Sequence, residues 1–285
     1  MLFRSGSDAS GVVLKVGTAV RNWKPGDRVT VHCNHVDDQD QSAHDDSMMA
    51  ANQRIWGYET NFGGLADLAV VKANQLMPKP AHLTWEEAAA LPLAGLTAYR
   101  AVFSRGNLQS RERILISGIG GGVAQFALQF AVAAGAEVWV TSSSGEKNAR
   151  AVALGAKGGF DYNAAGWPAQ AVARVGGGFD VIVDSAGGEG FGRLIDAASS
   201  GGRIVFFGAT RGDAQLPVRK VFWRQITLLG TTMGSPSDWA AMTAFVAEKR
   251  IRPVVSEIFP LARAGDAFAL MERGGQFGKI VVAMA

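Results

Sequence analysis

The stretch that decides the fold reads Ile114-Leu115-Ile116-Ser117-Gly118-Ile119-Gly120-Gly121-Gly122-Val123-Ala124. Its apolar start predicts a buried strand, its four glycines predict a turn, and the apolar pattern over residues 123–134 predicts a helix. Glycines let a backbone approach phosphates, and the free N–H groups at a helix N-terminus supply partial positive charge. The stretch therefore predicts a pyrophosphate site in the pattern Gly118-x-x-Gly121-Gly122-x-Ala124, and with it a dinucleotide cofactor. A flexible turn between a strand and a helix is the alternative.

Strand-like and helix-like segments alternate around and beyond this turn. Further strands are predicted over residues 137–141, 159–161, 180–184, 203–208 and 226–230, and further helices over 146–154, 168–175 and 190–198. Such alternation is typical of βαβ units in a parallel sheet. The strands lack period-2 alternation, as expected where helices cover both faces. Six strands make a complete dinucleotide-binding fold.

The flanking segments predict a second, mainly antiparallel domain. Short strands are predicted over 11–16, 28–32 and 65–72, and a capping box at Thr84-x-x-Glu87 opens a helix over 85–90. The remaining predicted elements are a helix over 91–103, a polar acidic loop over 37–51, helices over 237–249 and 262–272, and strands over 254–259 and 279–283.

Composition limits the class of protein. The chain is 48% apolar, which is enough for a substantial core, and it has no run of about 18 uncharged apolar residues that would span a membrane. The single cysteine, Cys33, fits a reducing compartment, so a cytoplasmic location is expected. The formal charge is +3, and the basic residues are scattered, so no nucleic-acid partner is expected.

Further motifs give the chain a family resemblance. They are Gly6-Ser7-Asp8-Ala9-Ser10-Gly11-Val12-Val13, Trp23-Lys24-Pro25-Gly26-Asp27-Arg28-Val29, Ala88-Ala89-Ala90-Leu91-Pro92 with Leu96-Thr97-Ala98-Tyr99, and Gly278-Lys279-Ile280-Val281. Together with the glycine turn, they resemble the medium-chain dehydrogenase/reductase superfamily over nearly the whole chain. The resemblance implies an α/β fold: a Rossmann doubly wound parallel sheet plus a GroES-like, mainly antiparallel β catalytic domain. We expect the Rossmann cofactor domain over residues 96–251 and the catalytic domain over 1–95 and 252–285.

Two branches of the superfamily share the finer resemblance. Residues 52–87, above all Gln53-Arg54-Ile55-Trp56-Gly57-Tyr58-Glu59-Thr60-Asn61-Phe62-Gly63-Gly64-Leu65, resemble the crotonyl-CoA carboxylase/reductases. From Leu91 onward the chain is similar to zinc-free quinone oxidoreductases. Both branches reduce conjugated carbonyls, which implies a small-molecule conjugated carbonyl as the substrate.

The resemblance also implies two features of the whole protein. Family members carry several dozen residues before the motif at Gly6, so the catalytic domain is expected to be incomplete at its N-terminus. Adding that upstream segment is then expected to restore soluble, active protein. Members of the family also pair through the strand near residues 226–230, which implies a homodimer.

Zinc is not expected in this chain. Ser7 stands where zinc-dependent relatives place a ligand histidine, and one cysteine cannot build a four-cysteine zinc lobe. The segment His32-Cys33-Asn34-His35, with His44 beyond it, offers the alternative of a metal site. Its spacing matches no standard site, so a strand end with incidental histidines is the interpretation we favour.

The end of the second strand indicates the cofactor. An NAD-specific fold places Asp or Glu there for the ribose 2′-hydroxyl, whereas this strand ends Thr141-Ser142-Ser143-Ser144. Lys147 and Arg150 follow, and cations near hydroxyls favour a 2′-phosphate, hence NADPH. The alternative is that Lys147 and Arg150 lie on a solvent-exposed helix face and bind no cofactor. The resemblance adds Tyr162 near the adenosine phosphate, and Thr97 and Lys279 near the nicotinamide. The predicted cofactor-binding set is Thr97, Gly118, Gly121, Gly122, Val123, Ser142, Ser143, Lys147, Tyr162, Gly208 and Lys279.

The expected chemistry is hydride addition to the β-carbon of an enone or enoyl thioester. Negative charge then develops on the carbonyl oxygen, which needs hydrogen-bond donors rather than a strong base. The predicted catalytic set is Tyr58, Glu59, Asn61 and Thr97. In carboxylating relatives, an aromatic residue and a glutamate at positions 58 and 59 help hold carbon dioxide, together with a later histidine. That histidine position holds Ser185, so carboxylation is not expected.

A structural role is the equal alternative for Glu59, as a carboxylate that accepts loop N–H groups. The sequence as a whole predicts a zinc-independent, NADPH-dependent oxidoreductase acting on a quinone, enone or enoyl thioester. An alcohol or aldehyde dehydrogenase-like enzyme and an NADPH-binding protein without turnover are the alternatives.

Overall fold

The structure is a computed structural model that describes residues 5–35 and 47–284. His44 and most of the loop predicted over 37–51 lie outside the described residues. The chain forms two compact units. The first unit comprises the residues up to Leu96 and those from Met233 onward, and the second unit is Thr97–Thr232.

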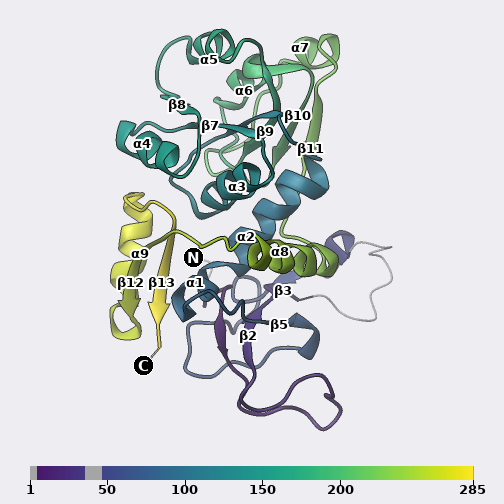
Figure 1. Cartoon of the computed structure of the whole chain (residues 1–285), viewed down its shortest axis with the longest axis vertical. Coiled ribbons are helices and arrows are strands. Elements are labelled where there is room, and N and C mark those ends of the chain that lie inside the picture. Colours follow the sequence, from purple (N-terminus) through teal and green to yellow (C-terminus); the bar gives the residue numbers. More distant parts are fainter. Residues whose placement is uncertain (1–4, 36–46, 285) are drawn as a thin grey trace. The chain divides into compact units, whose positions relative to one another are not determined.

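The second unit is built on a six-stranded parallel sheet (Figure 1). Its strands are β6 (Arg113–Ile116), β7 (Glu137–Thr141), β8 (Gly158–Phe160), β9 (Phe179–Asp184), β10 (Ala198–Phe206) and β11 (Thr227–Gly230). Their order is β11-β10-β9-β6-β7-β8, which is the doubly wound Rossmann order, so the predicted fold of this part is confirmed. β6 and β9 are neighbours at the point where the order reverses. β11 forms one edge of the sheet, and the homodimer predicted through this strand stays a prediction.

Helices cover both faces of this sheet. They are α3 (Gly122–Ala133), α4 (Gly145–Ala153), α5 (Trp167–Val175), α6 (Phe191–Ala197) and α7 (Val218–Trp223), and a π-helical turn, η4 (Arg100–Arg105), precedes the sheet. Figure 1 shows α3 and α4 on one face of the sheet and α5 and α6 on the other. Leu115, Trp139 and Ile182 share one buried cluster with residues of α5 and α6. Their neighbours along each strand are also buried, which explains the missing alternation.

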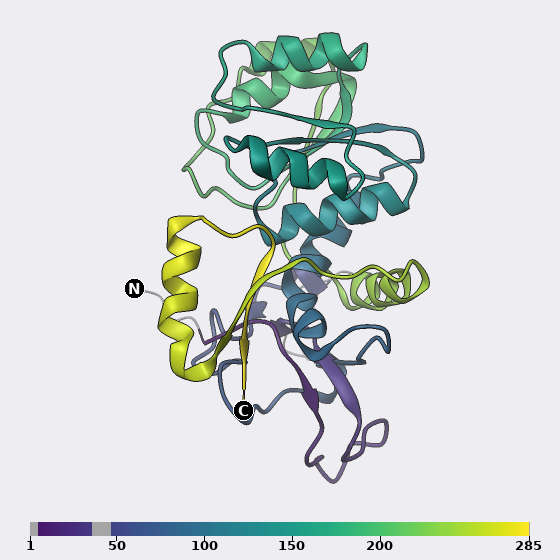
Figure 2. The same cartoon turned by 60° about the vertical axis from the view of Figure 1, so that its left-hand side comes forward.

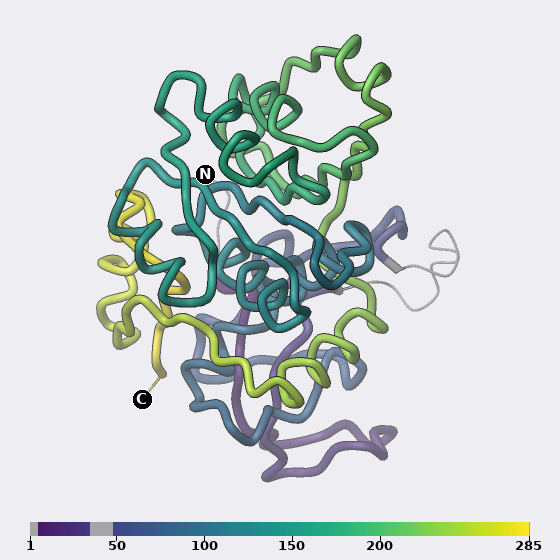
Figure 3. Tube along the Cα trace, turned by 45° about the horizontal axis from the view of Figure 1, so that its top comes forward, coloured from purple at the N-terminus to yellow at the C-terminus, as the bar shows by residue number. Residues whose placement is uncertain are grey.

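The first unit contains a three-stranded antiparallel sheet in the order β1-β2-β5. Its strands are β1 (Ser10–Val12), β2 (Arg28–Val31) and β5 (Leu76–Pro78), with Val12 opposite Arg28 and Val29 opposite Pro78. Figure 3 traces the long purple loop that joins β1 to β2. The strand predicted over residues 65–72 is wrong. Leu68 and Val70 are 72% and 87% exposed, and the third strand is formed by the later residues of β5.

The rest of the first unit is helical or paired in short strands. The elements are β3 (Asn34–His35), β4 (Arg54–Ile55), α1 (Trp85–Ala90), α2 (Pro92–Tyr99), α8 (Pro236–Glu248), β12 (Val255–Pro260), α9 (Ala264–Arg273), β13 (Lys279–Ala283) and the 3-10 turns η2 (Ser47–Met49), η3 (Ala73–Gln75) and η5 (Leu261–Arg263). The unit boundary falls within α2, before Thr97. The predicted capping box is confirmed, because Thr84 and Glu87 each accept the other's backbone N–H. Figure 2 shows α9 alongside the parallel β12–β13 pair.

Helix α8 falls in the first unit, whereas the sequence placed residues 233–251 with the cofactor domain. Packing explains the difference. The Trp239 ring lies 5.5 Å from the ring of His32, and a Cβ built on Gly95 would lie 3.1 Å from the Met242 sulfur. Among the residues that the structure describes, no helix is long and apolar enough to cross a membrane.

Candidate functional site

The glycine turn after β6 has the geometry expected of a phosphate site. Gly118 has a φ of +63°, which favours glycine, and its N–H donates to Oγ1 of Thr141 at 3.2 Å. Gly121 is the N-cap of α3 and has no side chain with which to cap the helix. The first N–H groups of α3, at Gly122 and Val123, therefore meet no competing cap side chain. This is the arrangement that the sequence predicted, and the binding role of these four residues stays a prediction.

The loop after β9 is tied to this turn by Asp184, which is 2% exposed. Its carboxylate accepts hydrogen bonds from the Ser117 hydroxyl, from the Ala186 N–H at 3.1 Å and from the Gly187 N–H at 2.9 Å. The bonds join the ends of β6 and β9, where the strand order reverses and where open α/β sheets bind ligands. This role of Asp184 in joining the two strand ends was not predicted from the sequence. Its signal was an acidic residue closing the apolar strand Asp180-Val181-Ile182-Val183-Asp184.

A groove of about 490 Å³ lies at this edge of the sheet in the second unit. It runs from Ser117 and Gly118 to Tyr162, and its wall includes Asp184 and Arg211. The groove therefore joins the glycine turn to the segments that follow β8, β9 and β10.

The serines after β7 pack against the segment after β8. The Ser142 N–H donates to the Phe160 carbonyl at 3.0 Å, and the Tyr162 hydroxyl donates to Oγ of Ser143 at 3.0 Å. Ser144 caps α4 by accepting the N–H of Lys147 at 3.2 Å. The structure thus brings together three predicted cofactor residues, Ser142, Ser143 and Tyr162, and places Lys147 in the first turn of α4.

Gly208 follows β10 and lies against the backbone of the loop after β9. A Cβ built on Gly208 would come within 2.9 Å of the Ser185 carbonyl oxygen. A side chain would force one of the two segments to move. Glycine at this position therefore permits a close approach of two loops beside the groove.

Two of the resemblance motifs meet in the first unit. The Ser5 N–H donates to the Gly57 carbonyl at 2.9 Å, and the N–H groups of Gly64 and Leu65 donate to the carbonyls of Gly6 and Ser5. A Cβ on Gly57 would lie 1.9 Å from the Gly6 oxygen. The segments around Gly6 and around 57–65 therefore form one continuous structure.

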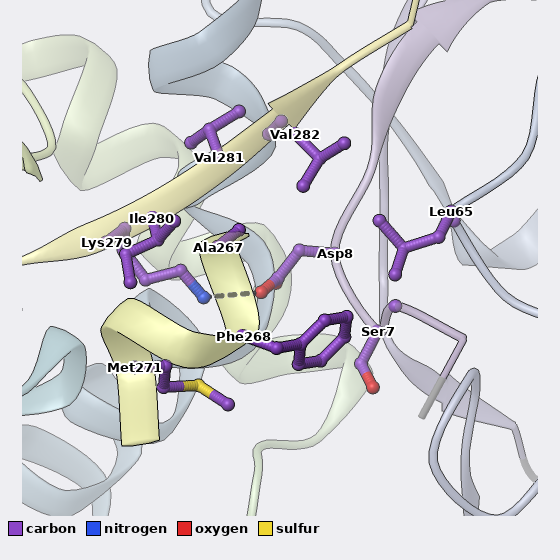
Figure 4. A pocket seen from close by; sticks show the side chains of 13 residues that line it. Ser7, Asp8, Leu65, Ala267, Phe268, Met271, Lys279, Ile280, Val281 and Val282 are labelled. Atoms are coloured by element: carbon purple, nitrogen blue, oxygen red, sulfur yellow. Dashed lines mark hydrogen bonds and ion pairs between the residues drawn. The ribbon is translucent and has the colours of Figure 1, made fainter. Parts of the chain in front are cut away.

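A small pocket of about 170 Å³ lies beside these segments (Figure 4). Figure 4 shows an ion pair at its wall between Asp8 and Lys279, with Phe268 from α9 next to Ser7. The Lys279 Nζ lies 2.6 Å from Oδ2 of Asp8, and the other carboxylate oxygen accepts the Leu93 N–H at 2.5 Å. Lys279, which was predicted near the nicotinamide, thus bonds to Asp8 within the first unit.

The predicted catalytic residues lie in different surroundings. Glu59 is exposed, and its Oε2 accepts the Ile55 N–H at 2.8 Å, which is the contact that the structural alternative requires. Tyr58 is half-buried and Asn61 is exposed on the same loop, whereas Thr97 is buried in α2. Their catalytic roles stay predictions.

Two of the residues considered for a metal, His32 and Cys33, are deeply buried. Burial lowers the pKa of His32 to about 4, although its hydrogen bond with the Gly234 carbonyl and the charge of Asp238 oppose the shift. Burial also raises the pKa of Cys33. Within residues 5–35 and 47–284, no three His, Cys, Asp or Glu side chains are grouped as metal ligands.

Two of the predicted cofactor residues, Gly118 and Tyr162, line the groove of the second unit. Near Gly118, the N-terminus of α3 has no side-chain cap, and the Tyr162 hydroxyl is bonded to Ser143 after β7. These donors suit phosphate oxygens and ribose hydroxyls.

Comparison with known proteins identifies the family. Residues 122–248 match the family described as zinc-binding dehydrogenase, and residues 2–81 match the alcohol dehydrogenase GroES-like domain. Crotonyl-CoA reductase of Streptomyces collinus is 36% identical over 298 residues, covering 97% of this chain and 67% of the relative. The chain belongs to the medium-chain dehydrogenase/reductase superfamily. The predicted family and the predicted Rossmann and GroES-like fold are confirmed.

Other members of the superfamily are similar over nearly the whole chain. Quinone oxidoreductase of Mus musculus is 27% identical, covering 98% of this chain and 80% of the relative. A solved NAD-dependent alcohol dehydrogenase is 35% identical with a TM-score of 0.93, covering 99% of this chain and 83% of its own. A 2-octenoyl-CoA carboxylase reductase, solved with NADP and 2-octenoyl-CoA, is 34% identical with a TM-score of 0.90, covering 98% of this chain and 67% of its own.

These relatives confirm the predicted class of enzyme, an oxidoreductase of the reductase type. The carboxylase reductase holds NADP, the cofactor predicted for this chain, and the alcohol dehydrogenase is NAD-dependent. Asp184 and Arg211 line the groove and Asp8 lines the smaller pocket, and none of the three was among the predicted site residues.

Proposed function

We propose that this protein uses NADPH to reduce a conjugated carbonyl, with an enoyl thioester or an enone as the acceptor and without zinc. The observation that carries the proposal is the likeness to crotonyl-CoA reductase, which extends over 97% of the chain and thus through both units. The solved relative with NADP and 2-octenoyl-CoA supports the same acceptor class.

The second unit holds the cofactor. The N–H groups at Gly122 and Val123 bind the pyrophosphate, and Gly118 and Gly121 let the backbone approach it. Ser142, Ser143, Lys147 and Tyr162 bind the phosphorylated ribose, because they offer hydroxyl and ammonium donors where NAD-specific folds place a carboxylate. The bound cofactor supplies the hydride.

Three of the residues predicted for catalysis serve the acceptor. The carbonyl oxygen gains negative charge as the β-carbon is reduced, so it needs N–H or O–H donors. Tyr58, Asn61 and Thr97 carry such donors, and we propose them for this role. Glu59 holds its loop through the Ile55 N–H rather than acting as a base.

The proposal that zinc is not needed rests on Ser7 and Asp8. A serine hydroxyl is a poor zinc ligand, and the Asp8 carboxylate is already engaged by Lys279 and by the Leu93 N–H. Hydrogen-bond donors to the developing oxyanion then take the role that a Lewis acid would have. Elemental analysis of the active protein is expected to find less than one zinc per chain.

Two other acceptor classes have specific support. The likeness to quinone oxidoreductase favours a quinone, which also accepts a hydride at a conjugated carbonyl. The likeness to an NAD-dependent alcohol dehydrogenase favours an alcohol or aldehyde. A protein that binds NADPH without turnover is the remaining alternative.

One acceptor panel separates these classes. Purified protein is incubated with NADPH or NADH and with crotonyl-CoA, a short enone, a quinone or an aldehyde, with and without bicarbonate. We expect NADPH oxidation with the conjugated carbonyls and no carboxylated product. Oxidation with the aldehyde alone would contradict the proposal, and binding of NADPH with no oxidation across the panel would favour the protein without turnover.

A further inference from the structure

Arg211 lies over the aromatic ring of Tyr162. Its guanidinium carbon is 5.4 Å from the ring centroid, and both residues line the groove of the second unit. Arg211 follows β10, whereas Tyr162 follows β8, so the contact bridges segments that leave strands far apart in the sheet. A planar guanidinium stacks well on such a ring.

The loop that carries Arg211 is anchored by backbone bonds. The Arg211 N–H donates to the Ala186 carbonyl at 2.8 Å, and the Gly188 N–H donates to the Gly212 carbonyl at 2.7 Å. Gly188 has a φ of +59°, and a Cβ there would lie 2.7 Å from the Arg211 carbonyl oxygen. The loop after β10 is therefore fixed on the loop after β9, and this arrangement orients the Arg211 side chain.

The same tyrosine marks the predicted ribose end of the groove. Its hydroxyl donates to Ser143, which follows β7, the strand end where Rossmann folds bind the adenosine ribose. Arg211 is exposed and has no ion pair or side-chain hydrogen bond within the described ranges 5–35 and 47–284. The contact with the ring does not use the hydrogen-bonding capacity of the guanidinium N–H groups, and a guanidinium can bind a phosphate through two such groups at once.

The charged groups along the groove are of both signs. Glu189 and Arg193 also line it, and Nη1 of Arg193 donates to the Tyr162 carbonyl at 3.2 Å. Within the described residues, Arg211 is the cation that lies over the ring of Tyr162. Tyr162 contacts both Arg211, through its ring, and Ser143, through its hydroxyl.

We propose that Arg211 binds the 2′-phosphate of NADPH and, held by Tyr162, sets the preference for NADPH over NADH. The proposal rests on the proposed function only in taking NADPH as the cofactor, and it is independent of the acceptor. A ligand without the 2′-phosphate gains nothing from Arg211, because the guanidinium then has no anion to bind.

The test compares ligands that differ in the 2′-phosphate. Arg211→Met removes the charge and keeps an unbranched side chain over Tyr162. By calorimetry without any acceptor, we expect its Kd for NADPH and for adenosine 2′,5′-bisphosphate to rise about tenfold. The Kd for NADH and for 5′-AMP should stay within about twofold of wild type. Arg211→Lys keeps the charge and should recover part of the loss.

The control is Arg219→Ala, which removes an exposed arginine on α7, outside the groove. It should leave all four affinities unchanged. An equal loss for ligands with and without the 2′-phosphate would overturn the proposal in favour of adenine stacking or a structural role. Unchanged affinity of Arg211→Met for NADPH, or a wild type that binds NADH as tightly as NADPH, would also overturn it. If wild type binds NADPH but reduces no acceptor, the proposed function fails while the role of Arg211 is still decided.

Discussion

The phenolic hydroxyl of Tyr162 donates a hydrogen bond to Oγ of Ser143, with 3.0 Å between the two oxygens. The bond joins the segment after β8 to the segment after β7, and it places the Ser143 hydroxyl next to Tyr162, which lines the groove. Each residue alone is unremarkable for a loop. Their pairing where NAD-specific folds place a carboxylate is what favours a phosphorylated ribose.

Replacing Tyr162 by Phe tests this pairing. The variant keeps the ring under Arg211 and loses only the hydroxyl. We expect KM for NADPH to rise about threefold to tenfold, as for the loss of one hydrogen bond to a charged group, with kcat unchanged at saturation. Steady-state kinetics with both cofactors checks this. An equal rise of KM for NADH would show that the hydroxyl does not serve the 2′-phosphate.

Replacing Gly208 by Ala tests the close approach of the loops after β9 and β10. The added Cβ would lie 2.9 Å from the Ser185 carbonyl oxygen, so the backbone must shift. We expect the free energy of unfolding in urea to fall by about 1–3 kcal/mol. Gly230→Ala is the matched control, because its Cβ would come no closer than 3.9 Å to Phe206. Similar losses for both variants would contradict the packing argument.

Replacing Lys279 by Met tests the ion pair in the first unit. The two side chains are only 21% and 17% exposed, and the change removes the ion-pair partner of Asp8 while keeping its hydrogen bond from the Leu93 N–H. We expect the free energy of unfolding to fall by about 2 kcal/mol, a value between those typical of surface and of buried ion pairs. The double variant Asp8→Asn with Lys279→Met should recover part of this loss. If Lys279→Met changes only the KM for NADPH and leaves stability intact, its predicted cofactor role is favoured over the structural one.

The buried His32 predicts a loss of stability in mild acid. Burial lowers its folded pKa to about 4, whereas the unfolded value is 6.5. Between these values the unfolded chain binds the extra proton, so the free energy of unfolding falls as the pH drops from about 6.5 to about 4. From the size of this pKa shift, protonation of His32 lowers the free energy of unfolding by about 2 kcal/mol between pH 7 and pH 5.

The variant His32→Gln should lose that part of the acid sensitivity in urea unfolding at the two pH values. Glutamine can still donate to the Gly234 carbonyl, which His32 contacts at 3.2 Å. His82→Gln, which removes a half-buried histidine bonded to the Ile251 carbonyl, serves as the control and should keep the wild-type difference. An unchanged pH dependence in His32→Gln would show that another group dominates.

Local signals predicted most of the elements well. The strand over 137–141 and the helix opened by Thr84 have the predicted bounds, because burial pattern and capping are properties of neighbouring residues. The strand predicted over 65–72 failed because a strand needs a partner backbone. β2 pairs with residues 76–78 instead, and this choice depends on the tertiary structure. Helix α7 was missed because, unlike the helix opened by Thr84, it has no side-chain cap to mark its start.

The candidate site also contains some features that could be predicted from the sequence and others that depend on the tertiary structure. The glycine turn and the serines after β7 could be predicted, because a motif and a strand end are visible in the sequence. The three bonds to Asp184 and the stacking of Arg211 on Tyr162 join residues brought together only by the order of strands in the sheet. No short sequence pattern contains both partners of such contacts.

The central claim is that the protein is an NADPH-dependent reductase of conjugated carbonyls. Its most direct test is the rate of nicotinamide oxidation with crotonyl-CoA, compared between NADPH and NADH at equal concentrations. The account predicts a kcat/KM at least about tenfold higher with NADPH, with the double bond reduced in the product. A preference for NADH, or no reduction of crotonyl-CoA, an enone or a quinone with either cofactor, would contradict it.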